Sequence, residues 1–182
     1  MTFQPLRLAA AILAACAVSA PALSQDPVFQ TEATHAVIMD HETGEILFSK
    51  NGEEAMPPAS MSKLMTAFMA FEALKTGAIE MDDELRVSEE AWRRGGAASG
   101  SSTMFLDVNS RASVSDLLRG IIVQSGNDAC IVVAEALEGS EAAFADAMTD
   151  RAQAMGLETA NFVNTTGWPD PDHVISAADL AR

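Results

Sequence analysis

Ser60 and Lys63 form the pair of residues in this chain whose types and spacing best suggest chemistry. They lie three positions apart in a helix-forming run, so one helical turn places both side chains on one face. Burial favours the neutral form of a lysine, and a neutral amine can take the proton of a neighbouring hydroxyl. The spacing therefore predicts a serine nucleophile with a lysine general base. The alternative is an N-cap serine followed by a surface lysine, because this spacing also arises by chance.

The helix that carries this pair is expected to run from Ser60 to Gly77, after two prolines that interrupt the preceding chain. Apolar residues occupy every side of it: Met61, Leu64, Met65, Phe68, Met69, Phe71 and Leu74. We therefore expect a helix that is buried all round, in which a charged Lys63 is costly. The free N–H groups at its start would suit a developing oxyanion.

A second polar group, Ser125-Gly126-Asn127, lies between two apolar runs that we expect to be helices, 114–124 and 128–137. Ser113 is placed to cap the first of them. A polar tripeptide between two apolar helices can present side chains into a cleft, but all three residue types are also common in ordinary turns. Ser140 should cap a further helix, 141–155, which Gly156 ends.

Residues 36–40 and 45–49 alternate as strands do, and Gly44 between them can adopt the positive φ of a tight turn. This hairpin predicts part of an antiparallel sheet, to which a short strand at 84–88 can be added. The small residues at 95–102 indicate either a lid over a site or a surface loop. Residues 164–173 are expected to be a loop, and 175–182 the start of a helix.

The 182 residues are 48% hydrophobic and carry a net charge of −15, which indicates one globular domain and argues against a nucleic acid or an anionic membrane as partner. Cys130 lies in an apolar run and is expected to be a buried thiol. The three histidines show no zinc-binding spacing, so we expect no metal and no other cofactor.

Residues 1–24 are typical of a signal peptide, with Arg7 before an apolar stretch too short to span a bilayer. Cleavage near Gln25 is expected, and a lipoprotein signal that ends at Cys16 is the alternative. Either interpretation predicts an exported protein.

Two boxes, Pro58-Ala59-Ser60-Met61-Ser62-Lys63 and Gln124-Ser125-Gly126-Asn127-Asp128-Ala129, resemble those of the penicillin-recognising serine enzymes. The resemblance is to the serine-type D-alanyl-D-alanine carboxypeptidases, the low-molecular-weight penicillin-binding proteins, and extends over most of residues 34–182. Further matching stretches are Thr43-Gly44, 100–106, 118–120, Asn164 with Gly167, and 176–180.

The resemblance implies an α+β, β-lactamase/transpeptidase-like fold, in which an antiparallel sheet packs against a helical subdomain. It also implies an acyl-enzyme on Ser60, with Lys63 as its base and Ser125 as the proton shuttle to the leaving D-alanine. Asn127 would hold the substrate amide or orient Lys63, and the Ser60 N–H would form half of an oxyanion hole. The implied partners are peptidoglycan stem peptides and acylating β-lactams, and the implied location is the periplasm.

One departure concerns the third box of this family, a Lys-Thr-Gly on a late strand. Lys75-Thr76-Gly77 has the right residues, but its place predicts only a helix C-terminus. We therefore expect the genuine box, the remaining strands and any membrane anchor beyond residue 182. Residues 25–182 would then be the N-terminal part of a catalytic domain and would be poorly active or inactive alone. The alternatives are a non-catalytic peptidoglycan-binding protein and a β-lactamase-like hydrolase.

Overall fold

A tight turn closes the first hairpin, which joins β1 (Ala36–Met39) to β2 (Ile46–Lys50) in antiparallel register. The Asp40 carboxylate accepts hydrogen bonds from the Thr43 N–H and hydroxyl, and Gly44 has a φ of 72°. Asp and Gly are suited to these two roles because Asp can bond the backbone ahead of it and Gly has no Cβ to clash. The predicted hairpin is confirmed.

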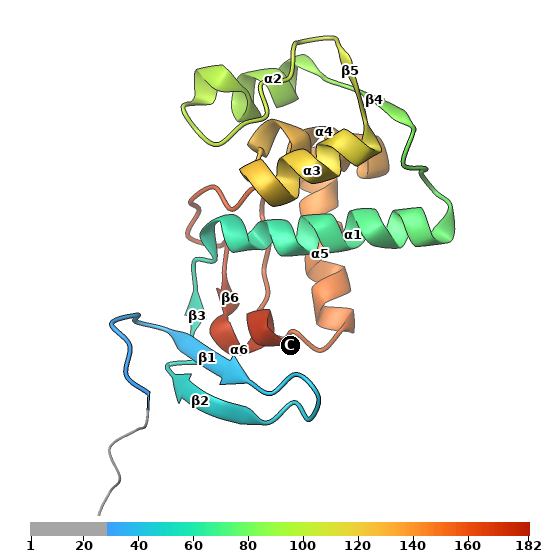
Figure 1. Ribbon diagram of the computed structural model, residues 1–182. Coiled ribbons are helices and arrows are strands. Elements are labelled where there is room, and N and C mark those ends of the chain that lie inside the picture. The colour runs from blue at the N-terminus through green and yellow to red at the C-terminus, as the bar shows by residue number, and fades with distance from the viewer. Residues whose placement is uncertain (1–28) are drawn as a thin grey trace, which may run out of the picture. The chain divides into compact units, whose positions relative to one another are not determined.

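The computed structural model describes residues 29–182 (Figure 1), so the predicted signal peptide and Cys16 lie outside the described residues.

Two shorter antiparallel ladders complete the strand pairing in this part of the chain. The strands β4 (Glu84–Arg86) and β5 (Arg111–Ser113) pair with each other, as do β3 (Ala55–Met56) and β6 (Ile175–Ser176). The predicted strand at 84–88 is thus present but shorter. The other three strands were missed because two or three residues are too few to show an alternating pattern. The β3–β6 pair brings a late segment beside the residues that lead to Ser60.

Ser60 lies in a 3-10 helix, Ala59–Ser62, and α1 follows as Lys63–Thr76. Gly77, with a φ of 75°, ends α1, as predicted for the Lys75-Thr76-Gly77 stretch. The prediction that the helix is buried all round is wrong, because Leu64 is 64% exposed and Met61 45% exposed. Among the described elements, α1 packs against α3, α4 and α5, and these leave part of its apolar surface open.

The predicted helices are all present as α3 (Val114–Gln124), α4 (Asn127–Glu138), α5 (Glu141–Ala154) and the short α6 (Ala177–Ala181). The hydroxyls of Ser113 and Ser140 accept N–H bonds from Asp116 and Ala143, as N-caps do. Two elements were not predicted: α2 (Glu89–Gly95) and the 3-10 turn Ala97–Ser99 that follows it.

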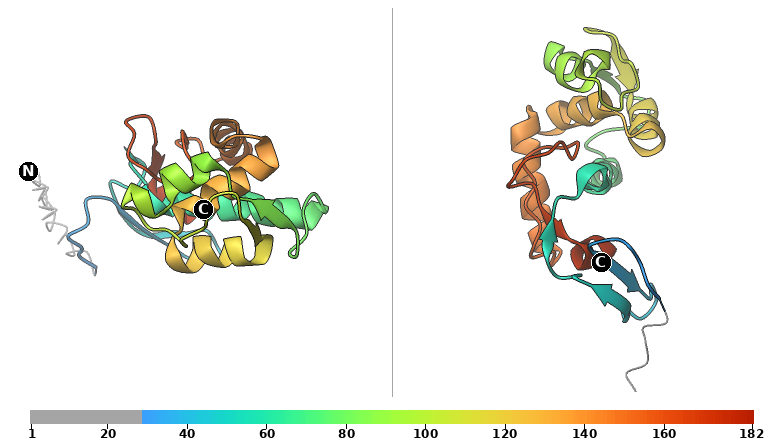
Figure 2. Two further views of the ribbon diagram at one scale, coloured as in Figure 1. Left: turned by 90° about the horizontal axis from the view of Figure 1, so that it is seen from above. Right: turned by 90° about the vertical axis from the view of Figure 1, so that its left-hand side faces the viewer.

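Within residues 31–182, α1 lies between two groups of elements (Figures 1 and 2). On one side are α2, α3, α4 and the β4–β5 ladder, and on the other are β1, β2 and α6. Two apolar clusters meet at α1: Ala67 and Ala70 belong to the one built on α3 and α4, and Met65 to the one built on α5 and β6. The arrangement is α+β, and Ser60 lies at the N-terminal end of this central helix. Within residues 29–182, no helix has the length and apolar character needed to cross a membrane.

Candidate active site

Ser60 and Lys63 are in contact, as the spacing predicted. The Lys63 Nζ lies 3.2 Å from the Ser60 Oγ and donates a second, 2.6 Å hydrogen bond to the carbonyl of Thr166. Ser60 is exposed, whereas Lys63 is only 5% exposed. The hydroxyl can therefore meet a ligand while the amine behind it is shielded from water.

The electrostatic surroundings of Lys63 favour its neutral form. No carboxylate of the described residues pairs with its Nζ, and burial lowers the pKa of this amine. The nearby Cys130 opposes that shift only as a thiolate, and burial raises the pKa of the Cys130 thiol to about 12. Near neutral pH the thiol is protonated and the effect of burial prevails. A neutral Nζ that donates to the Thr166 carbonyl has its lone pair available for the Ser60 proton.

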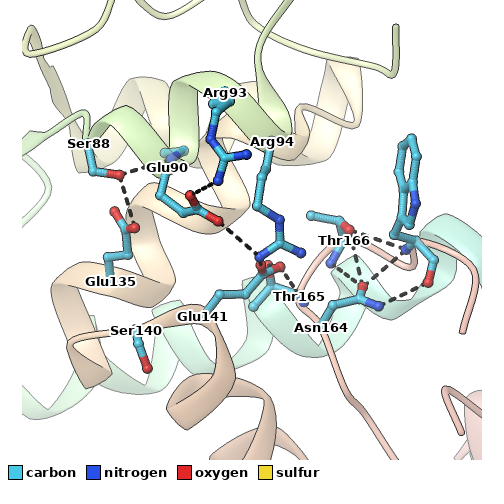
Figure 3. A network of polar contacts seen from close by, with 12 residues as sticks. Ser88, Glu90, Arg93, Arg94, Glu135, Ser140, Glu141, Asn164, Thr165 and Thr166 are labelled. Atoms are coloured by element: carbon cyan, nitrogen blue, oxygen red, sulfur yellow. Dashed lines mark hydrogen bonds and ion pairs between the residues drawn. The ribbon is translucent and has the colours of Figure 1, made fainter. Parts of the chain in front are cut away.

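The loop 164–168 supplies that carbonyl, and a single side chain shapes it (Figure 3). The Oδ1 of Asn164 accepts hydrogen bonds from the N–H groups of Thr166, Gly167 and Trp168, and its Nδ2 donates to the Trp168 carbonyl. Asn164 is 6% exposed, so the side chain that makes these bonds is buried. The loop is therefore held in one conformation by its own residue.

Two helices anchor the neighbouring Thr165. Its carbonyl accepts from the Thr66 hydroxyl of α1, and its N–H and hydroxyl both donate to the Glu141 carboxylate at the start of α5. Glu141 also pairs with Arg94 at 2.9 Å, as Figure 3 shows. Contacts on both sides of the loop fix the Thr166 carbonyl under Lys63.

Ser125 sits in the turn between α3 and α4 with a φ of 56°, a left-handed conformation that a residue with a side chain seldom adopts. It is half-buried, and its hydroxyl makes no hydrogen bond within residues 29–182. A strained serine with an unpaired hydroxyl is typical of a functional position rather than of an ordinary turn.

Asn127, at the first position of α4, is 6% exposed. Its backbone N–H donates to the Ser102 carbonyl and its Nδ2 to the Ser101 hydroxyl. Its Oδ1 is the one buried side-chain oxygen or nitrogen of the described residues that has no partner. The small-residue stretch 95–102 is therefore bonded to this residue, and it contains a 3-10 turn.

Asp128 fixes the chain that follows this stretch. It is fully buried, and its carboxylate accepts from the Thr103 hydroxyl and from the N–H groups of Met104, Leu106 and Ala129. Asp128 thereby holds the segment 103–106 against the start of α4.

A pocket of about 270 Å³ adjoins these groups. Its lining includes Asn127 and Trp168, together with Thr166, whose carbonyl Lys63 contacts. Arg93 and Arg94 line it too, although each is paired with Glu90. The pocket thus joins the α3–α4 turn to the loop under Lys63.

The predicted site residues are brought together only in part. Ser60 and Lys63 share a hydrogen bond, whereas Ser125 and Asn127 bond to neither of them in the described structure. The sequence did not predict that the loop 164–168 contacts Lys63, because a backbone carbonyl such as that of Thr166 leaves no signature in a sequence. A buried glutamate such as Glu141 also resembles an ordinary helix-start acid in the sequence. Within residues 29–182, no three His, Cys, Asp or Glu side chains cluster as metal ligands do.

The structure thus combines a serine hydroxyl, a buried amine three residues later and a Ser-Gly-Asn turn on a central-helix α+β scaffold, which is the combination that the resemblance to the penicillin-recognising serine enzymes rests on. Residues 18–182 match the D-alanyl-D-alanine carboxypeptidase family, and the chain belongs to that family. The matches include the D-alanyl-D-alanine carboxypeptidase DacF of Bacillus subtilis, 41% identical over 82% of this chain and 37% of the relative. DacA of Haemophilus influenzae is 41% identical over 84% of this chain and 38% of the relative.

Solved structures agree with this assignment. Penicillin-binding protein 5 of Haemophilus influenzae superposes with a TM-score of 0.79 at 41% identity, covering 84% of this chain and 44% of that one. A penicillin-binding protein of Listeria monocytogenes in its ampicillin-bound form has a TM-score of 0.68 at 28% identity, covering 85% and 61%. The chain spans about two fifths of the length of the two curated relatives above. The expected fold class is confirmed.

Proposed function

We propose that the full protein is a serine-type D-alanyl-D-alanine carboxypeptidase, which removes the terminal D-alanine from the pentapeptide stems of peptidoglycan. The observation that carries this proposal is the buried Lys63 amine, which has no carboxylate partner in residues 29–182 and lies 3.2 Å from the Ser60 hydroxyl. The names of the relatives support the substrate class.

In the first step, the Ser60 Oγ attacks the carbonyl of the peptide bond that joins the last two D-alanines. Lys63 takes the hydroxyl proton, and its hydrogen bond to the Thr166 carbonyl keeps its lone pair directed at Ser60. The negative charge then develops on the former carbonyl oxygen. The N–H of Ser60, next to the start of α1, is suited to bind that oxygen.

In the second step, the C–N bond breaks and the leaving D-alanine needs a proton on its amine. The unpaired hydroxyl of Ser125 is suited to deliver it, and Lys63 to replenish it. Water then attacks the ester on Ser60, so one difficult amide cleavage becomes two easier steps. The Oδ1 of Asn127 supports a binding role, because a buried acceptor without a partner can be satisfied by the N–H of a bound peptide.

The same serine should react with penicillin, because a β-lactam carbonyl is attacked as the peptide carbonyl is. The ampicillin-bound relative supports this expectation. We further propose that the protein is exported to the periplasm, on the basis of the signal-peptide pattern in residues 1–24. Cell fractionation with an antibody to residues 29–182 tests this, and retention in the cytoplasm would contradict it.

The decisive experiment uses the full-length protein and its Ser60→Ala variant. We expect D-alanine release from a peptide that ends in D-alanyl-D-alanine, a stable penicilloyl adduct on Ser60 by mass spectrometry, and neither with the variant. Fast penicillin turnover in place of a stable adduct would indicate a β-lactamase-like hydrolase. Peptidoglycan binding that survives in Ser60→Ala, without D-alanine release by either protein, would indicate a non-catalytic binding protein.

A further inference from the structure

A buried chain of hydrogen bonds runs behind the nucleophile and has no part in the steps above. His173 is 2% exposed and Ser62 is 1% exposed, and they come from segments 111 residues apart. The His173 Nε2 and the Ser62 Oγ are 2.6 Å apart, and the Ser62 Oγ lies 3.0 Å from the Ala59 carbonyl. This series of hydrogen bonds thus ends at Ala59, the residue that precedes Ser60.

The direction of these bonds follows from the surroundings of the imidazole. The backbone N–H of Val163 donates to the His173 Nδ1 at 3.1 Å, so Nδ1 must be unprotonated. A neutral imidazole then carries its proton on Nε2 and donates it to Ser62. The oxygen of Ser62 is used as the acceptor, and its own proton is directed to the Ala59 carbonyl. Each group in this series of hydrogen bonds thus acts once as a donor toward the next. An imidazolium is excluded, because it would carry a proton on Nδ1 that points at the Val163 N–H.

Ala59 is a residue that needs such support. Its φ is 48°, in the left-handed region that residues with a side chain seldom adopt. From the other side Gly167 packs against it so closely that a Cβ on Gly167 would lie 1.8 Å from the Ala59 oxygen. The Ala59 carbonyl is therefore held between a hydroxyl donor and a glycine.

The carbonyl of Ala59 and the N–H of Ser60 belong to one peptide unit. Because that unit is planar and trans, fixing the direction of the carbonyl also fixes the direction of the N–H. This is the N–H that the proposed oxyanion site uses. A hydrogen bond on one edge of the peptide thus aims the donor on its other edge.

We propose that His173 and Ser62 are positioning residues, which hold the Ala59–Ser60 peptide so that the Ser60 N–H and Oγ point toward the reacting carbonyl. This inference rests on the proposed function. It predicts a role in the chemical step rather than in binding, because neither side chain lines the pocket beside Asn127.

The first test measures penicillin acylation of the full-length protein by stopped-flow, which separates the initial dissociation constant from the acylation rate constant. Ser62→Ala should lower the acylation rate constant at least tenfold and change the dissociation constant less than twofold. Ser176→Ala is the matched control, because Ser176 is also fully buried and bonds the Asp179 N–H but has no contact with Ala59. That control should lose thermal stability and keep the acylation rate.

Two variants of His173 separate the bond to Ser62 from the bond to Val163. The amide of His173→Gln reaches the position of Nε2 and can still donate to Ser62, whereas the shorter amide of His173→Asn reaches only the position of Nδ1. We expect the Gln variant to acylate at least threefold faster than the Asn variant. Ser62→Ala combined with His173→Asn should be no slower than Ser62→Ala alone, because both changes break one chain.

The outcomes distinguish this inference from the proposed function. If the wild-type protein is not acylated at Ser60, both fail. If the wild type is acylated but Ser62→Ala acylates as fast as Ser176→Ala, only the positioning role fails. Nitrogen-15 NMR gives a readout that needs no activity: His173 should be the neutral tautomer protonated on Nε2 at neutral pH. The opposite tautomer, or an imidazolium, would overturn the inference.

Discussion

Two segments line the site and differ in their hydrogen bonding. The loop 164–168, which we call the paired wall, contacts Lys63 through the Thr166 carbonyl, and the α3–α4 turn 125–127, which we call the unpaired wall, shares a pocket with that loop through Asn127. In the loop, one Asn164 oxygen satisfies three backbone N–H groups, and the carbonyl of Thr166 accepts from Lys63. In the turn, the hydroxyl of Ser125 and the Oδ1 of Asn127 have no partner among residues 29–182. The paired wall is therefore built for positioning, and the unpaired wall is left open for a ligand. Burying a polar group without a partner is costly, so such a group persists where something else satisfies it.

The largest expected effect comes from removing the base. Lys63→Ala should lower penicillin acylation and D-alanine release of the full-length protein by roughly 10³-fold. It should also lower thermal stability, because the buried Thr166 carbonyl loses the amine that donates to it. Lys75→Ala is the control: it changes the lysine at the C-terminal end of α1 and should leave both rates unaltered. Loss of activity in the control alone would make Lys75-Thr76-Gly77 the functional box.

The next prediction concerns the paired wall. Gly167→Ala should destabilise the protein by about 3 kcal/mol or more, because it combines a φ of 79° with a Cβ that would clash with the Ala59 oxygen. Gly156→Ala has a similar φ of 84° and open space around the new Cβ, so it should cost only about 1 kcal/mol. Chemical denaturation of both variants measures the difference. Equal losses would show that the clash relaxes and that the loop is not tightly set against Ala59.

Two asparagines compare the walls directly. Asn164→Ala should cost about 3 kcal/mol of stability, because the N–H groups of Thr166 and Gly167 lose their acceptor and that of Trp168 keeps only the Thr166 hydroxyl. Asn127→Ala should cost about 1 kcal/mol, since only the bond to Ser101 is lost. It should nevertheless lower the acylation efficiency by roughly 10- to 100-fold, because a group that would bind the substrate amide is gone. If Asn127→Ala acylates normally, the unpaired oxygen is not a substrate contact.

The catalytic pair and the α3–α4 turn could be predicted from the sequence more readily than the role of the loop 164–168. Ser60, Lys63 and the Ser125-Gly126-Asn127 turn have residue types that suggest chemistry by themselves, and the apolar runs on both sides of the turn placed it between two helices. The loop 164–168 acts through backbone groups, and a sequence does not show which carbonyl will lie under a lysine. The exposure of Leu64 and Met61 could not be foreseen either, because an apolar pattern shows what can be buried but not what is available to cover it.

The smallest effect that tests the comparison is the pH dependence set by Lys63. Burial lowers its pKa, and the base is the neutral form, so the fraction of competent protein rises as pH rises through that lowered pKa. Well below the pKa, the acylation efficiency should increase about tenfold per pH unit, and it should level off above the pKa. The midpoint should fall clearly below the 10.5 of an exposed lysine. A midpoint near 10.5, measured from pH 5 to 11 with a penicillin stable over that range, would mean that Lys63 stays charged. The paired wall would then hold an ammonium ion against the Thr166 carbonyl, and another group would have to act as the base.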